Sequence, residues 1–211
     1  MRLAAALTLS AALLLGAAQP AAAAPTVDLR PPGSVVVGPG TGTYATFAAA
    51  EVPASVRAMD LYIYGPNGDR ALVDLQIRNR PGIWEGEYKF HRSEGFGRWK
   101  AVLTMRDNAG RTSKGGTVHF TVKRRTTLST ADSQSRGSGV SGVLRKMNAK
   151  GRYTAYAGQK VRLYRWNGSW TYVTADVTDG KGRYSFKKRS GKLQIRYAGS
   201  GLNAGAVRTV S

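Results

Sequence analysis

The chain has 211 residues, no cysteine, and 32 Lys and Arg against 12 Asp and Glu, which gives a net charge of +20. The absence of cysteine excludes disulfides, thiol nucleophiles and cysteine metal sites, so each domain has to fold on its hydrophobic core alone. The excess of positive charge indicates an anionic environment or partner.

The first 23 residues have the pattern of a secretory signal peptide. Arg2 precedes an apolar run over residues 3–17, and small residues at 21–24 provide the cleavage site. Cleavage is expected among Ala22 to Ala24, and the proline after Ala24 favours Ala23. The apolar run is shorter than the roughly 20 residues of a membrane span. We therefore expect a secreted, extracellular protein without a membrane span, associated with the cell wall only by non-covalent contacts.

Residues 25–123 predict a first Ig-like β-sandwich domain. Short runs that alternate between apolar and polar residues, separated by Gly, Pro, Asn and Asp, are typical of strands with one buried face. Met59, Leu61 and Ile63, for example, are expected to face the core. The predicted strands are 35–37, 43–47, 58–64, 71–78, 84–90, 99–106 and 117–123. Residues 47–57 are the one helical candidate, but Pro53 interrupts them, so at most one short turn is expected there.

Residues 124–139 are rich in Ser, Thr and Gly, and predict a linker or the first strand of a second domain. Residues 140–211 then predict a second sandwich, with strands at 140–145, 160–165, 171–177, 183–187 and 193–197. Its expected inward set is Val161, Leu163, Val173, Ala175, Val177, Tyr184, Phe186, Leu193, Ile195 and Tyr197. The sequence thus predicts an all-β protein of two antiparallel Ig-like sandwiches in tandem after a signal peptide.

The positive charge is concentrated in the second half of the chain. Residues 124–211 hold 18 Lys and Arg and three Asp and Glu, a net of +15. Residues 25–123 hold 13 Lys and Arg and nine Asp and Glu, a net of +4. An anionic partner is therefore expected to contact the second domain.

Motifs over about 60 residues of the second half carry a family resemblance. They are G-x-L at Gly142 and Leu144, A-G-Q-x-V-x-L from Ala157 to Leu163, W-x-x-V at Trp170 and Val173, T-D-x-x-G-x-Y-x-F from Thr178 to Phe186, and R-Y-A-G-S from Arg196 to Ser200. The segment resembles the bacterial Ig-like and carboxypeptidase-regulatory-like (transthyretin-like) modules of secreted proteins. Residues 95–122 are similar to bacterial Ig-like domains. The resemblance implies accessory modules for binding or spacing, with no catalytic motif.

Candidate catalytic and metal-binding groups are few. His91 lies near Ser93 and Glu94, but a local cluster rarely has the geometry of a catalytic triad. His119 alternates outward on its strand. Asp176 and Asp179 in "DVTDGKG" offer two carboxylates for calcium, or a glycine turn in which Asp179 binds its own backbone. We expect the turn, no metal, no cofactor and no enzymatic activity.

Residues 160–175 interleave cations with aromatic rings, as sites for polyanions or glycans do. With a two-residue Asn167-Gly168 loop, Trp166 pairs with Ser169 and Tyr172 is buried. A three-residue loop, 167–169, pairs Trp166 with Trp170 and matches Val161 and Leu163 with Ala175 and Val173 inside. This inward match favours the three-residue loop, which leaves an exposed strip of Arg162, Tyr164, Trp166, Trp170 and Tyr172. Cross-strand packing is the alternative explanation of the rings.

The candidate polyanion or glycan contacts are Arg162, Tyr164, Trp166, Trp170, Tyr172, Lys187, Lys188, Arg189 and Arg196. The leading hypothesis is a secreted, non-enzymatic structural or interaction module that binds an anionic cell-wall polymer through its basic second domain. One alternative is a carbohydrate-binding module with a stacking platform of Trp166, Trp170 and Tyr172. Another is a secreted hydrolase or inhibitor, which requires a polar cleft. No specific nucleic-acid partner is expected.

Overall fold

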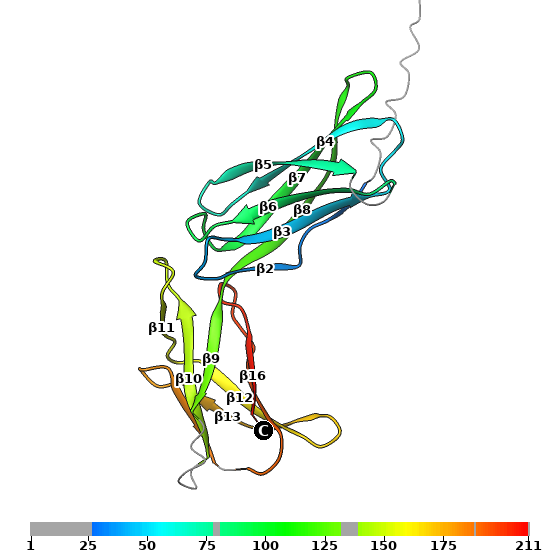
Figure 1. The fold of residues 1–211 in the computed structure, drawn as a ribbon. Helices are drawn as coiled ribbons and strands as arrows, with labels where there is room; N and C mark the ends of the chain where they lie inside the picture. Colours follow the sequence, from blue (N-terminus) through cyan, green and yellow to red (C-terminus); the bar gives the residue numbers. More distant parts are fainter. Residues whose placement is uncertain (1–26, 78–80, 132–138, 188, 211) are drawn as a thin grey trace, which may run out of the picture.

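The structure, a computed structural model, describes residues 27–77, 81–131, 139–187 and 189–210, so the predicted signal peptide lies outside it. These residues form sixteen strands and no helix. None of them belongs to a helix that could cross a membrane. The strands build two Ig-like β-sandwiches that lie end to end (Figure 1). The prediction of an all-β fold with two sandwiches in tandem is confirmed.

The first sandwich has two layers joined by one strand. One layer holds β1, β3 and β6, and the other holds β4, β7, β8 and β2. Strand β5 pairs with β4 along Arg70–Leu75 and with β6 through Gln76 and Ile77, so it links the layers. All pairs are antiparallel except β2 with β8. The strands are β1 (Asp28–Arg30), β2 (Ser34–Val37), β3 (Thr43–Ala50), β4 (Val56–Tyr64), β5 (Arg70–Ile77), β6 (Trp84–Phe90), β7 (Gly97–Asp107) and β8 (Thr112–Arg124).

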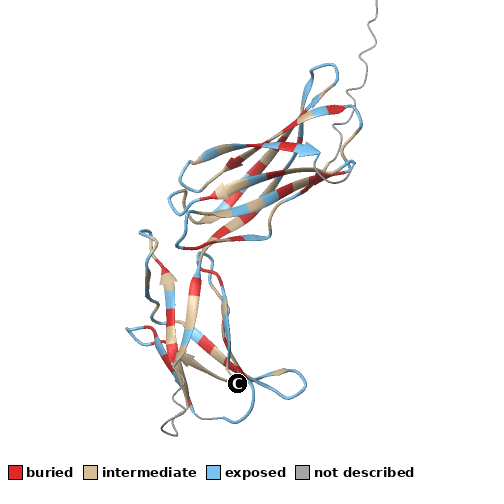
Figure 2. Ribbon diagram, viewed as in Figure 1, coloured by how far each residue is buried: buried red, intermediate tan, exposed pale blue. Residues whose placement is uncertain are grey.

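Aromatic rings fill the core of this sandwich. Phe90 contacts Trp99 with the ring centroids 5.2 Å apart and Phe120 at 5.7 Å, in edge-to-face geometry. Such pairs add to the free energy gained from burial. Met59, Leu61 and Ile63 are buried beside them, as their alternation predicted (Figure 2).

Residues 47–57, the one helical candidate, form no helix, and the expected short turn follows Pro53. Phe47–Ala49 pair with β6, and the Pro53 carbonyl accepts a hydrogen bond from Val56 N–H in a turn. The pairing of β3 with its neighbours outweighs the helix propensity of the alanines.

The second sandwich also has two layers. Strand β10 pairs with β9 on one side and with β11 and β14 on the other, while the facing layer has the order β13-β12-β15-β16. Strand β9 occupies the stretch for which the sequence left open a linker or a first strand. The bounds are β9 (Thr126–Ala131), β10 (Val140–Met147), β11 (Tyr153–Ala155), β12 (Lys160–Trp166), β13 (Trp170–Val177), β14 (Arg183–Phe186), β15 (Leu193–Tyr197) and β16 (Ala206–Val210).

The expected inward set of this sandwich is confirmed except on β13. Val161, Leu163, Tyr184, Phe186, Leu193, Ile195 and Tyr197 are buried in one cluster. Ala175 is half-buried and Val177 is exposed. A β-bulge opposite Leu163 and Tyr164 shifts the pairing, so the inward alternation that starts at Val173 is not continued.

Three turns share the pattern Asp/Asn-x-x-Gly-Arg, at residues 107–111, 148–152 and 179–183. In each turn the first side chain accepts hydrogen bonds from two backbone N–H groups, and the glycine has a left-handed φ of 74–75°. For Asp179 the donors are Lys181 and Arg183, both at 2.8 Å. The predicted glycine turn, in which Asp179 binds its own backbone, is confirmed.

These turns give stability a defined dependence on pH. Backbone hydrogen bonds from Arg183 and Arg111 lower the pKa values of Asp179 and Asp107 below the usual value of 3.8. Each ionised carboxylate therefore stabilises the folded protein at pH values above its unfolded-state pKa. This stabilisation is lost as the pH falls from about 4 through the lowered folded-state pKa values. We expect D107N/D179N to flatten the decline in thermal midpoint between pH 5 and pH 2, because Asn keeps the acceptor oxygen, as Asn148 does, but does not titrate.

The control for that comparison is N148D, which is expected to steepen the same decline. Equal pH dependence of the wild type and D107N/D179N would contradict the argument.

The two sandwiches meet at a junction built from backbone hydrogen bonds and apolar packing. Arg124 N–H donates to Leu202 O at 2.8 Å, and Arg125 N–H donates to Val37 O at 3.0 Å. The Arg124 guanidinium lies 4.7 Å from the centroid of the Phe96 ring. Met147, at the end of β10, is fully buried in the cluster that forms the core of the first sandwich.

Candidate functional site

The outward side of the sheet β13-β12-β15-β16, called the outer face below, holds most of the predicted contact residues. Because side chains alternate along a strand, those opposite each other in the register share a side. Tyr164 is opposite Tyr172 on β13 and Gln194 on β15. Arg162 is opposite Arg196. Since Val161 and Leu163 are buried, Arg162 and Tyr164 point away from the core.

The hairpin between β12 and β13 positions the aromatic side chains. Trp166 is directly opposite Trp170, so the predicted three-residue loop, 167–169, is confirmed. The proposed partners of the buried residues are wrong: Leu163 is opposite Thr174 and Val161 is opposite Asp176. The bulge accommodates one extra residue of β13. The pairs Trp166–Trp170 and Tyr164–Tyr172 lie between the bulge and the loop and keep the predicted register, whereas the pairs on the other side of the bulge are shifted by one residue.

Each aromatic row is an edge-to-face pair. The Trp166 and Trp170 centroids are 5.2 Å apart with their planes at 64°, and Tyr164 and Tyr172 are 5.9 Å apart at 73°. Trp170 and Tyr164 are half-buried, whereas 46% of Trp166 and 55% of Tyr172 is exposed. The rings therefore pack across the strands, and one ring of each pair remains open to a ligand.

Cations lie against these rings. The Arg196 guanidinium is 4.2 Å from the Tyr164 centroid and 5.9 Å from that of Trp170. Lys192 Nζ is 5.9 Å from both tryptophan centroids. These cation–π contacts orient the positive groups along the aromatic rows.

The outer face carries positive charge without carboxylates. Among the described residues, the acids of the second sandwich are Asp176 and Asp179. Asp176 lies on the inward side of β13 and accepts a hydrogen bond from Ser185 N–H at 2.7 Å, and Asp179 is held in its turn. The ion pairs between described residues, Arg30–Asp28 and Arg111–Asp107, both belong to the first sandwich. The cations of the outer face are thus not neutralised by neighbouring acids.

The structure does not place the other predicted contact residues on this face. Lys187 follows β14 in the opposite layer, and Lys188 lies outside the described residues. Arg189 lines a small cavity together with Arg165. Lys192 and Arg165 were not among the predicted contacts, because Lys192 lies just before β15 begins and Arg165 alternates to the inward side of β12.

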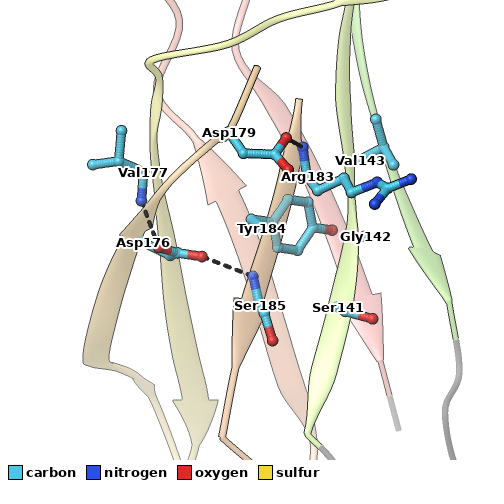
Figure 3. Close-up of a pocket in the computed structure, with 9 residues that line it drawn as sticks. All are labelled: Ser141, Gly142, Val143, Asp176, Val177, Asp179, Arg183, Tyr184 and Ser185. Atoms are coloured by element: carbon cyan, nitrogen blue, oxygen red, sulfur yellow. Dashed lines mark hydrogen bonds between the residues drawn. The ribbon is translucent and has the colours of Figure 1, made fainter. Parts of the chain in front are cut away.

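The larger groove of the second sandwich, with a volume of 550 Å³, lies between β14 and the end of β13 (Figure 3). Asp176 accepts hydrogen bonds from Val177 and Ser185 N–H, and Tyr184 Oη donates to Ser129 O at 2.7 Å. Burial raises the pKa of Tyr184 to about 12, so this phenol stays protonated. The Asp176 carboxylate and the Tyr184 hydroxyl are thus already hydrogen-bonded within the protein, and we assign the groove a structural role.

The two histidines and the acid beside His91 belong to the first sandwich. Glu94 accepts hydrogen bonds from the Tyr88 hydroxyl at 2.6 Å and from His91 N–H at 2.8 Å, which closes a turn. His119 is exposed on β8, as expected. The described residues contain no group of three or more His, Cys, Asp or Glu that could hold a metal ion.

Comparison with known proteins gives similarity at the level of fold. No protein-family model and no curated protein matches the chain. Solved structures that match include a two-domain fibronectin type-III segment of chicken tenascin (11% identity, 86% of this chain and 99% of that chain, TM-score 0.37). A marsupial T cell receptor also matches (13%, 87% and 71%, TM-score 0.38).

A tetra-tandem repeat from the extending region of a large adhesion protein is similar at 13% identity, with 86% of this chain covered and a TM-score of 0.31. The match spans 48% of that structure, about half its length.

Proposed function

We propose that this protein is a non-catalytic interaction module that binds an anionic polymer at the cell surface through the outer face of its second sandwich. One observation carries the proposal: arginine, lysine and aromatic side chains share one face of a sheet, and no carboxylate among the described residues shares it. A face of this kind attracts polyanions by many weak contacts that salt screens. The signal-peptide pattern supports a location outside the cell, and the similarity to carboxypeptidase-regulatory-like modules remains a prediction.

Binding to an immobilised polyanion such as heparin tests this function. We expect R162Q/R196Q to elute at lower salt than the wild type, and the slope of log K against log salt to fall by about 1–2, because each lost cationic contact releases about one counterion fewer. The measurement is affinity as a function of NaCl concentration.

The matched control is R145Q/K150Q, which removes the same charge from exposed positions on and beside β10, in the opposite layer. An equal loss of heparin affinity in the two double variants would indicate that binding depends on net charge and not on a defined face. An affinity that does not change with NaCl concentration would contradict the electrostatic mechanism.

A carbohydrate-binding module is a second candidate, because Trp166 and Tyr172 keep exposed ring faces. The edge-to-face geometry of the pairs leaves no flat platform of three rings. This function predicts that a neutral polysaccharide changes tryptophan fluorescence, and that W166A removes the change. An unchanged spectrum would assign the rings to cross-strand packing.

A further inference from the structure

A small cavity lies beside the tip of the β12–β13 hairpin. It has a volume of 210 Å³ and is lined by Arg165, Thr171, Tyr172, Val173 and Arg189. We call it the hairpin cleft. Arg165 comes from the end of β12, and Arg189 from the segment between β14 and β15, so two separate parts of the chain bring two arginines to one cavity.

The two arginines have no acidic partner in the cleft. None of the described residues that line it is a carboxylate. Asp176 and Asp179, the acids of the described second sandwich, are hydrogen-bonded to backbone N–H groups elsewhere. Two cations that share a small cavity repel each other, and a bound anion removes this repulsion. We infer that the hairpin cleft is an anion-binding site.

The shape of the site indicates the chemical class of the anion. The guanidinium group presents a planar fork that binds oxyanions through two hydrogen bonds. Two forks that come from different segments of the chain need acceptor oxygens that point in different directions. A tetrahedral phosphoryl group has such oxygens, whereas the two oxygens of a carboxylate lie in one plane and suit one fork.

The volume indicates that the cleft takes one group and not a whole molecule. Sites that enclose a small-molecule ligand usually measure about 300–1,000 Å³, and the cleft measures 210 Å³. Tyr172 lines the cleft and also belongs to the outer face, where 55% of its surface is exposed. A polymer on the outer face can therefore place one of its groups in the cleft beside Tyr172.

The proposal, which rests on the proposed function for its polymer, is that the anionic polymer bears phosphoryl groups and that Arg165 and Arg189 clamp one of them. The two arginines of the cleft and the cations of the outer face thus have different roles. The arginines of the cleft recognise one phosphoryl group by its geometry, and the cations of the outer face attract the polymer by its charge.

The test is an NMR titration of the full mature chain with inorganic phosphate, with acetate and NaCl at matched ionic strength as references. We expect saturable phosphate shifts at Thr171, Tyr172 and Val173. R165Q and R189Q should each weaken phosphate binding about tenfold or more, as for loss of a charge-assisted hydrogen-bond pair. R165K should weaken it as well, since lysine keeps the charge and loses the fork.

The control is R145Q, which removes one positive charge from an exposed position on β10, in the opposite layer, and should leave phosphate binding unchanged. Phosphate shifts that spread over all basic surfaces, equal responses to acetate, or an equal loss in R145Q would each overturn the phosphate site. Circular dichroism and thermal midpoints establish that every variant is folded.

A polymer experiment distinguishes failure of this site from failure of the proposed function. The wild type should bind polyphosphate more tightly than polygalacturonate, and R165Q should remove the difference. Polymer binding without any preference for phosphate would leave the outer face in place and overturn the cleft. Phosphate binding with no polymer binding would support the cleft and overturn the polymer function.

Discussion

Substitution of Gly142 by alanine is expected to unfold the second sandwich more readily than any surface substitution. An added Cβ would lie 1.9 Å from Ser129 O and 2.4 Å from Tyr184 Oη. Strand β9 and the buried tyrosine would both have to move, and the 2.7 Å hydrogen bond between Tyr184 and Ser129 would be lost. Overpacking and an unpaired buried hydroxyl together cost roughly 2–5 kcal/mol of the free energy of unfolding.

Urea unfolding of the full chain, followed by amide exchange at Leu163 in the core of the second sandwich, measures this loss. Gly180 provides the matched control, because it belongs to the same sandwich, has no left-handed φ, and an added Cβ there would meet no described atom within 4 Å. G180A should change stability by less than about 0.5 kcal/mol. Similar behaviour of G142A and G180A would show that β9 does not pass over Gly142 as described.

Substitution of Met147 by alanine is expected to destabilise the first sandwich, although Met147 belongs to a strand of the second. Its side chain is fully buried in the cluster that contains Phe47, Trp99 and Phe120. Removal of a buried methionine side chain usually costs about 2–5 kcal/mol, depending on how far the cavity collapses. We therefore expect faster amide exchange at Leu61 and Leu103, in the core of the first sandwich.

R145A is the control for M147A, because Arg145 lies two residues earlier on β10 and is exposed. It should leave exchange at Leu61 unchanged. If M147A accelerated exchange at Leu163 alone, the junction would not carry the apolar contact that couples the two sandwiches.

The junction itself depends on contacts between residues far apart in the chain. Arg124 accepts a hydrogen bond from Ala204 N–H and donates one to Leu202 O, and Met147 N–H donates to Arg125 O. In the sequence, Arg124 and Arg125 are two charged residues that follow an alternating strand pattern, and this pattern does not predict their hydrogen-bond partners. Only the return of the loop before β16 to the start of β9 brings them together.

The sequence by itself determined the fold class, most strands and most inward positions, because period-2 alternation records directly which side of a strand is buried. It also determined the glycine turns, since these depend on residues close together in the chain. The three-residue hairpin loop was predicted correctly, but from an inward match of Val161 and Leu163 whose partners the bulge changes. Period-2 alternation placed Arg162, Tyr164, Trp166 and Trp170 correctly on one outward strip.

Tertiary structure decided what alternation cannot record. The bulge that turns Val177 outward depends on the pairing of β13 with β12, and one extra residue reverses every side chain beyond it. Arg165 and Arg189 lie 24 positions apart and meet only because the β14–β15 segment folds against the hairpin. The site is therefore a property of strand order, since local pattern assigns each side chain a side of its strand but not a neighbour from another strand.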